Sequence, residues 1–264
     1  MTITQIIILA LVQGLTEFLP VSSSAHLVLT PKFFGWQDQG LAFDVAVHVG
    51  SLIAVVGYLR KDIYKLLTAW IKSIAARSHS SESHLAWSII LGSIPLGLGG
   101  LLLHDLADTV FRSPIVIAWA TIGFGLLLWF VDYYVTHRKP IENIGYGSAL
   151  FIGSSQVLAL IPGTSRSGIT MTTALMLGFT RQAAARFSFL LSIPAIGMAG
   201  GYKGLKLIEL PEIAWSDVIA GIVLSALSAY VCIHFFLKLL DKLGMFPFVV
   251  YRLILGAYLL YVFL

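Results

Sequence analysis

The sequence predicts an all-α polytopic membrane protein, in which six transmembrane helices and two re-entrant helical hairpins form a single membrane domain over residues 1–264. Hydrophobic residues make up 58% of the chain and charged residues only 11%, whereas soluble domains carry about 25% charged residues. Long apolar runs recur throughout, several of them near the roughly 20 residues that a helix needs to cross a bilayer core. Two further stretches are interrupted by proline and hydroxyl residues. This pattern excludes a water-soluble protein.

Six uninterrupted apolar stretches are predicted to span the membrane. They cover residues 41–59, 86–103, 114–134, 184–200, 216–237 and 246–264. The connection after the first stretch carries five basic residues, so we expect it to be cytoplasmic. Threading the chain from there puts most other lysines and arginines inside and both termini outside. Basic loops of this kind account for the net charge of +4 and exclude nucleic acid as a partner.

The two interrupted stretches, 3–34 and 148–178, are each long enough for two helical legs. Their breaks contain Pro-Val-Ser-Ser-Ser at 20–24 and Pro-Gly-Thr-Ser-Arg-Ser-Gly at 162–168. Proline blocks a continuous helix, and such breaks occur at membrane depth only inside protein or beside a wet cavity. Both stretches are therefore predicted to be re-entrant hairpins, the first entering from outside and the second from the cytoplasm.

Hairpin plus three spans, followed by hairpin plus three spans, is a repeat of inverted topology. The first repeat covers about residues 1–140 and the second about 141–264. In such folds the functional site lies near the midplane, where the broken helices meet. We therefore expect the two polar breaks to come together.

Glu17 follows Gln13 by four residues, so both side chains project from one face of a helix. A carboxylate deep in an apolar helix costs about 2.5–3.5 kcal/mol on insertion scales and is usually functional. The pair predicts a site for a divalent metal, Mg²⁺ or Ca²⁺, whose remaining ligands would be water and substrate phosphate. The alternative is a hydrogen-bonded glutamate that only holds helices together.

Three serines, Ser22, Ser23 and Ser24, stand where the second leg of the first hairpin begins, and His26 follows within one helical turn. A helix N-terminus with hydroxyl groups binds anions. Ser22 or Ser23 could share a face with the imidazole, which could serve as general base for a hydroxyl nucleophile or could itself attack phosphorus. The alternative is that the serines only cap the helix.

Arg166 supplies the second break with a cation. Its planar guanidinium is suited to bidentate phosphate binding. Gly163, Thr164 and Ser165 precede it and are further candidates for phosphate binding, the glycine because it lets backbone N–H groups approach a ligand. The alternative is an arginine that only neutralises Glu17.

Asp44 and His48 lie four residues apart in the first spanning helix and share one of its faces. They are weaker candidates, for support around the first-hairpin residues. A purely structural histidine–aspartate pair explains the spacing equally well.

Two motifs give the chain a resemblance to the undecaprenyl-diphosphate phosphatase family, also called the bacitracin-resistance protein family. They are QGLTEFLPVSSSAH at 13–26 and PGTSRSG at 162–168. Their order, their spacing and the chain length agree with the family over essentially the whole sequence. Gln13 departs from the glutamate common there, and Ser24-Ala25 departs from Thr-Gly, so a metal role for position 13 stays open.

The resemblance implies a bacterial inner-membrane enzyme that removes the terminal phosphate of undecaprenyl diphosphate, with a divalent metal and a pocket that opens to the periplasm. It implies a metal-linked role for Glu17 and Gln13 and a nucleophile or base role for Ser23 and His26. It also implies phosphate contacts at four positions, which are Arg166, Ser22, Ser24 and Ser165.

Two rival functions fit parts of the pattern. A lipid flippase could use the same anion site without chemistry, because inverted repeats with broken helices are typical of transporters. An intramembrane serine protease would use Ser23 and His26 but leaves Arg166 and Glu17 without a role. The sequence leaves open the nucleophile, the metal, the prenyl chain length, and whether the chain is a monomer or a homodimer.

Overall fold

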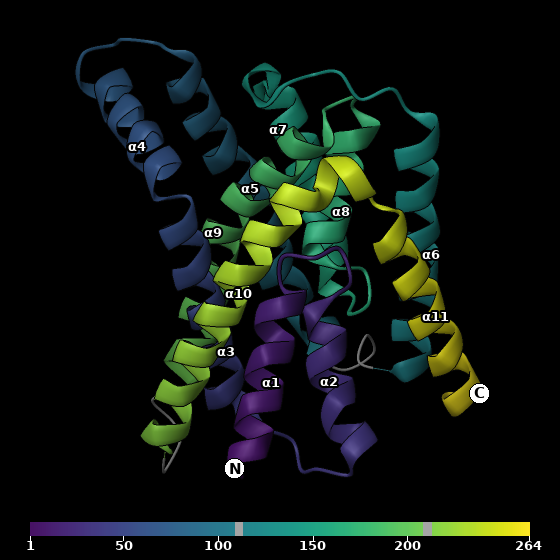
Figure 1. The fold of residues 1–264 in the computed structure, drawn as a ribbon. Helices are drawn as coiled ribbons and strands as arrows, with labels where there is room; N and C mark the ends of the chain where they lie inside the picture. The colour runs from purple at the N-terminus through teal and green to yellow at the C-terminus, as the bar shows by residue number, and fades with distance from the viewer. Residues whose placement is uncertain (109–112, 208–212) are drawn as a thin grey trace.

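The computed structural model describes residues 1–108, 113–207 and 213–264, most of them in helices. In chain order the elements are α1 (Ile3–Thr16), α2 (Ser23–Phe34), α3 (Gly40–Tyr58), α4 (Arg60–Ala75), α5 (Ser81–Asp108), α6 (Pro114–Tyr134), η2 (Ile141–Asn143), α7 (Tyr146–Ser155), η3 (Gln156–Leu160), α8 (Arg166–Met176), α9 (Arg181–Lys206), α10 (Trp215–Leu243) and α11 (Phe246–Phe263). The long helices stand side by side, and both termini lie at the same end of the molecule (Figure 1).

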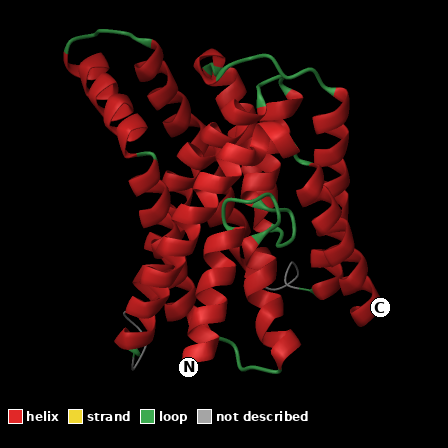
Figure 2. Cartoon of the chain, in the orientation of Figure 1, coloured by secondary structure: helices red, strands yellow, loops and turns green. Residues whose placement is uncertain are grey.

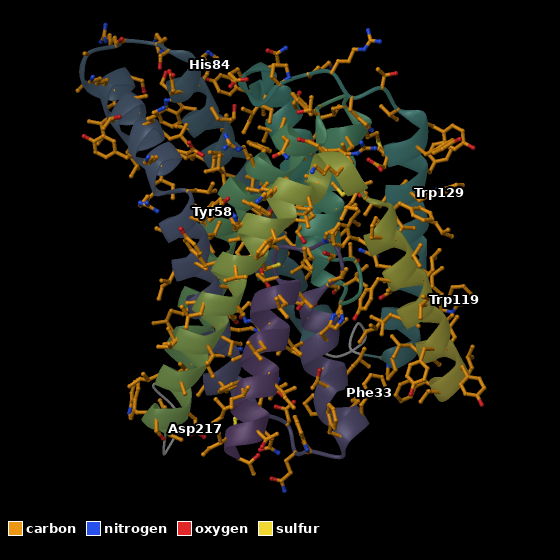
Figure 3. All side chains as sticks on the ribbon, in the orientation of Figure 1. Phe33, Tyr58, His84, Trp119, Trp129 and Asp217 are labelled. Carbon is orange, nitrogen blue, oxygen red and sulfur yellow. The ribbon has the colours of Figure 1, made fainter. Side chains whose placement is uncertain are left out.

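Among the described residues, six helices are long and apolar enough to cross a membrane: α3, α5, α6, α9, α10 and α11. Each contains or closely matches one predicted span, and the largest differences are extensions of α5, α9 and α10 beyond their predicted ends. The side chains on their outer faces are apolar and aromatic, as lipid requires. Trp119 and Trp129 of α6, for example, point outward (Figure 3) and are 59% and 38% exposed. The predicted polytopic class is confirmed.

Residues 60–75, predicted only as a basic connection, form the helix α4 at the end away from the termini (Figure 1). Ile63, Leu66 and Trp70 recur at helical spacing and join the core packed against α5. Trp70 also meets Trp87 of α5 edge to face, with ring centroids 5.8 Å apart. The connection is helical because one of its faces is apolar, although its lysines make it too polar to span a membrane.

Each interrupted stretch folds as two helical legs joined by a short loop. The first consists of α1 and α2, and the second of α7 and η3 followed by α8. Figure 2 shows the two loops close together in the middle of the molecule, away from both ends. α1 and α2 approach from the end that holds the termini, whereas α7 lies at the opposite end (Figure 1). That both pairs re-enter a bilayer, and that the halves form an inverted repeat, stay predictions.

Glycine and serine let α1 and α3 pack closely on α10. An added Cβ at Gly14 would lie 2.0 Å from Ser228 Oγ, and one at Gly50 would lie 2.0 Å from Ser225 Oγ. Ser225 Oγ donates in turn to the carbonyl oxygen of Val47 at 2.9 Å. Small residues that allow such close approach stabilise helix pairs in membranes. This packing fixes α1, and with it Glu17, against the body of the protein.

Gly153 of α7 is equally constrained, and its replacement gives a first testable prediction. A Cβ there would lie 2.0 Å from the carbonyl oxygen of Gly92 in α5. We expect Gly153→Ala to lower the free energy of unfolding by about 1–3 kcal/mol, although alanine is intrinsically the better helix former. Gly147→Ala in the same helix is the control, because no atom lies within 4 Å of its added Cβ. Equal melting temperatures for both variants in detergent would contradict the close α5–α7 contact.

Candidate active site

The two breaks meet in the structure, as the sequence predicts. The backbone N–H of Gly163 donates to Ser22 Oγ at 3.0 Å, and Ser167 Oγ donates to the carbonyl oxygen of Leu19 at 2.8 Å. The helices α2 and α8 both begin directly after a serine with positive φ, 74° at Ser22 and 70° at Ser165. Such strain in a residue other than glycine is typical of functional sites.

Glu17 and Arg166 form an ion pair across the junction. Arg166 Nη2 donates to Glu17 Oε1 at 2.8 Å, and their side chains are 14% and 6% exposed. Arg166 is the first residue of α8, and Glu17 is the C-cap of α1. Arg166 Nη1 is buried and has no hydrogen-bond partner among the described residues. The guanidinium therefore retains a free donor for an anion after it has paired with the carboxylate.

The second carboxylate oxygen of Glu17 receives a hydroxyl and an amide. Ser23 Oγ donates to Glu17 Oε2 at 2.6 Å, and Gln13 Nε2 donates to the same oxygen at 2.9 Å. The two side chains lie on one helix face, as their spacing predicts, while their role as metal ligands stays a prediction. Because a carboxylate can take the proton that its hydroxyl partner donates, Glu17 stands in the position of a general base for Ser23.

His26 has different partners from those that its spacing suggested. Its Nδ1 lies 2.7 Å from the backbone carbonyl oxygen of Ser22, and its Nε2 contacts the hydroxyl of Tyr251 on α11. A carbonyl oxygen only accepts, so Nδ1 carries the proton and Nε2 accepts from Tyr251. The described contacts therefore pair Ser23 with Glu17 and not with the imidazole, because the helical turn directs His26 toward α11.

The remaining hydroxyl groups mostly stabilise the breaks. Ser165 Oγ accepts from the backbone N–H of Gly168 at 3.0 Å and so caps α8, while Ser22 Oγ is engaged by the second break. Thr164 is fully buried, and its Oγ1 has no hydrogen-bond partner among the described residues. Ser24 is exposed, with its Oγ 3.3 Å from Ser22 Oγ. Their roles in phosphate binding stay predictions.

His48 lies at the edge of this group, and Asp44 lies outside it. His48 Nε2 is 3.9 Å from Glu17 Oε2, while its Nδ1 is held by the backbone carbonyl of Asp44 at 2.7 Å. The Asp44 carboxylate instead accepts from Gln39 Nε2 at 2.7 Å. The side-chain pair between His48 and Asp44 is therefore not formed, and only the histidine reaches the carboxylate at the junction.

Comparison of the sequence with known proteins places the chain in a family. A family model described as bacitracin resistance protein BacA matches residues 6–258. The chain belongs to this family. It is 58% identical to undecaprenyl-diphosphatase 2 of Stutzerimonas stutzeri over 100% of the chain and 99% of that protein. It is also 56% identical to the undecaprenyl-diphosphatase of Thioalkalivibrio sulfidiphilus over the full length of both, and 58% identical to that of Hahella chejuensis over 98% of each.

The oxygens at this junction of the BacA family member suit a hard divalent cation. Gln13 directs its amide nitrogen to Glu17, which leaves Gln13 Oε1 buried without a hydrogen-bond partner among the described residues. The carboxylate of Glu17 and the hydroxyl of Ser23 lie beside it. Carbonyl, carboxylate and hydroxyl oxygens are ligands that Mg²⁺ and Ca²⁺ accept. Within the described ranges no three His, Cys, Asp or Glu residues cluster, so neutral oxygens would supply most of the protein ligands.

Sequence reasoning missed two residues of α11 that reach the BacA motifs. Tyr251 contacts His26, and Arg252 is fully buried with its guanidinium against both breaks. A signal for Arg252 existed, because an arginine within an apolar span is rare and usually functional. Tyr251 had no such signal, since tyrosines are common near the ends of spanning helices.

Proposed function

We propose that this chain hydrolyses undecaprenyl diphosphate to undecaprenyl phosphate and inorganic phosphate, and so recycles the carrier lipid of cell-wall synthesis. The observation that carries the proposal is the Glu17–Arg166 pair, with Ser23 on the carboxylate and a free guanidinium nitrogen beside it. The relatives of the chain that are named undecaprenyl-diphosphatase support the choice of substrate. We place the protein in a bacterial inner membrane, with its termini and the opening of the site on the periplasmic side. The basic residues at the α4 end support this orientation, because basic loops tend to be cytoplasmic.

The substrate would bring a negative head group and a long apolar tail. Arg166 Nη1 and the hydroxyl of Ser24 are available to the terminal phosphate. An apolar groove of about 270 Å³ between α1 and α10 passes Leu15 and Leu19, which flank Glu17 in sequence. Prenyl units lying along this groove would remain in contact with lipid while the diphosphate reaches the polar junction.

The arrangement suits attack by Ser23 with Glu17 as its base. The Ser23 oxygen would bond to the terminal phosphorus as the bond from that phosphorus to the bridging oxygen breaks, and undecaprenyl phosphate would leave. The proton of Ser23 would pass to Glu17, 2.6 Å away. Glu17 would pass this proton to the departing undecaprenyl phosphate, and the regenerated carboxylate would activate a water that attacks phosphorus, so that the bond to the Ser23 oxygen breaks, inorganic phosphate leaves and Ser23 regains a proton. A water that attacks phosphorus directly, with Glu17 as base, would use the same residues, and His26 would exchange a proton at Nε2 once Tyr251 gives way.

Phosphate release by the purified protein tests this proposal. We expect the protein in detergent to release inorganic phosphate from undecaprenyl diphosphate, to stop when EDTA is added, and to recover with Mg²⁺ or Ca²⁺. A divalent cation at Glu17 and Gln13 would neutralise charge that develops on the phosphate. The measurement is a colorimetric phosphate assay, with Glu17→Ala and His26→Ala expected to lose most of the activity.

The outcome that contradicts the proposal also identifies its rival. A folded protein that releases no phosphate but moves undecaprenyl phosphate across liposome bilayers would be a flippase. If EDTA does not affect phosphate release, the protein is a hydrolase, but the proposal of a divalent metal is wrong. An exposed glutamate outside the junction, Glu142 of η2, provides the matched control, because Glu142→Ala should leave phosphate release unchanged.

A further inference from the structure

Arg252 of α11 is the most completely bonded charged side chain at the junction. It is fully buried, and its three guanidinium nitrogens all donate to backbone carbonyl oxygens. The acceptors are Thr121 at 3.1 Å and Ala120 at 3.4 Å in α6, Pro20 at 3.2 Å in the first break, and Gly163 at 2.8 Å and Thr164 at 3.0 Å in the second. One side chain thus ties both breaks to α6 and α11.

The surrounding chain is shaped to admit this guanidinium. A Cβ at Gly125 of α6 would lie 3.2 Å from Arg252 Cβ and 3.3 Å from its Nε, and a Cβ at Gly168 of α8 would lie 3.0 Å from its Nη1. Glycine at both positions leaves the space that the side chain fills. The hydrogen bonds of Arg252 to the two breaks therefore depend on α6 and α8 as well as on α11.

Among the described residues, the hydrogen bonds of Arg252 all go to neutral carbonyl groups and none to a carboxylate that would balance its charge. Glu17, the one carboxylate at the junction among the residues that the structure describes, is already paired with Arg166. Buried charges are normally paired, so an unbalanced guanidinium leaves the junction with an excess of positive charge. A bound anion with several negative charges would balance that excess.

We propose that Arg252 is a positioning residue that aligns the two breaks and makes their junction cationic enough to bind a diphosphate. The inference rests on the proposed function, because it deepens the account of the same site. Through Pro20, Arg252 fixes the loop between Glu17 and Ser23, and through Gly163 and Thr164 it fixes the loop that leads to Arg166. It acts through these residues and not by contact with the reacting atoms.

Three variants separate alignment from charge. Arg252→Lys keeps the charge but cannot bond five carbonyls, so we expect kcat for phosphate release to fall about 10- to 100-fold with little change in KM. Arg252→Gln loses the charge as well, so KM should also rise by about tenfold. Gly125→Ala keeps Arg252 and displaces it by a few tenths of an ångström, and kcat should fall about three- to tenfold. Gly123→Ala in the same helix is its control, because nothing lies within 4 Å of that Cβ.

A purely structural arginine provides the comparison for folding. Arg181 pairs with Asp132 through Nε at 2.6 Å and Nη2 at 3.1 Å, and its replacement by lysine or glutamine should lower the melting temperature without moving KM. If the Arg252 variants fold yet keep the wild-type kcat and KM, or if Gly125→Ala and Gly123→Ala behave alike, Arg252 is not a positioning residue.

Binding of inorganic pyrophosphate, measured by calorimetry, keeps this test apart from the proposed function. If the wild type releases no phosphate from undecaprenyl diphosphate, the proposed phosphatase function is wrong. Even then, pyrophosphate binding that is about tenfold weaker in Arg252→Gln than in the wild type would support a cationic junction. Equal pyrophosphate binding by wild type, Arg252→Lys and Arg252→Gln overturns the inference whether or not hydrolysis is observed.

Discussion

Replacement of Arg166 by alanine is expected to lower kcat for release of phosphate from undecaprenyl diphosphate by about 10²- to 10³-fold. Arg166 Nη1 is a buried donor without a partner among the described residues, and the bond from Nη2 to Glu17 fixes the guanidinium in place. Arg166→Lys should retain only part of the activity, because a lysine cannot bond the carboxylate and an anion through one planar fork. The measurement is steady-state phosphate release by purified variants whose melting temperatures equal that of the wild type.

The alternative that Arg166 only neutralises Glu17 predicts a different pattern. If the pair were structural, the uncharged double variant Glu17→Gln with Arg166→Gln would recover the activity that each single variant loses, since no buried charge would remain unpaired. We expect the double variant to be as inactive as the worse single variant. Arg186→Ala is the control, because Arg186 is an exposed arginine of α9 near the α4 end. Full recovery of activity in the double variant would show that Arg166 only neutralises Glu17 and does not bind the phosphate.

The convergence of the two breaks could be predicted from the sequence because local chemistry points to it. Pro20 and Pro162 interrupt apolar stretches, and each break needs partners for its free backbone groups, which only another polar segment can provide at membrane depth. Glu17 and Arg166 carry opposite charges in the two breaks. In the structure, Arg166 Nη2 lies 2.8 Å from Glu17 Oε1, which confirms that the two breaks meet.

Contacts that depend on which faces meet in space could not be predicted in this way. The spacing of Ser23 and His26 allowed a serine–histidine pair, but the chain turns so that Ser23 reaches Glu17 and His26 reaches Tyr251. Nothing local to residues 22–26 records the position of α11. The partners of Arg252 could not be predicted for the same reason, because its five acceptors come from three segments distant in sequence.

Replacement of Ser23 by alanine is the prediction that decides how the reaction begins. Ser23 Oγ lies 2.6 Å from Glu17 Oε2, so a nucleophile and its base are already in contact. We expect Ser23→Ala to lower kcat by about 10²- to 10⁴-fold, because the nucleophile is lost and Glu17 no longer has the hydroxyl whose proton it takes as general base. After a rapid acid quench the wild type should carry phosphate on Ser23, detectable by mass spectrometry of its peptides. Ser216→Ala, an exposed serine at the start of α10, is the folding control.

Each nucleophile predicts a different product of this quench. A phosphoserine survives acid, whereas a phosphohistidine on His26 would be lost in acid and kept in base, and direct attack by water would leave no labelled peptide under either condition. The 2.6 Å contact favours the serine because it provides a proton acceptor without any movement, while His26 must first leave Tyr251. If Ser23→Ala hydrolyses undecaprenyl diphosphate at the wild-type rate, then Glu17 activates water and the serine only positions the carboxylate.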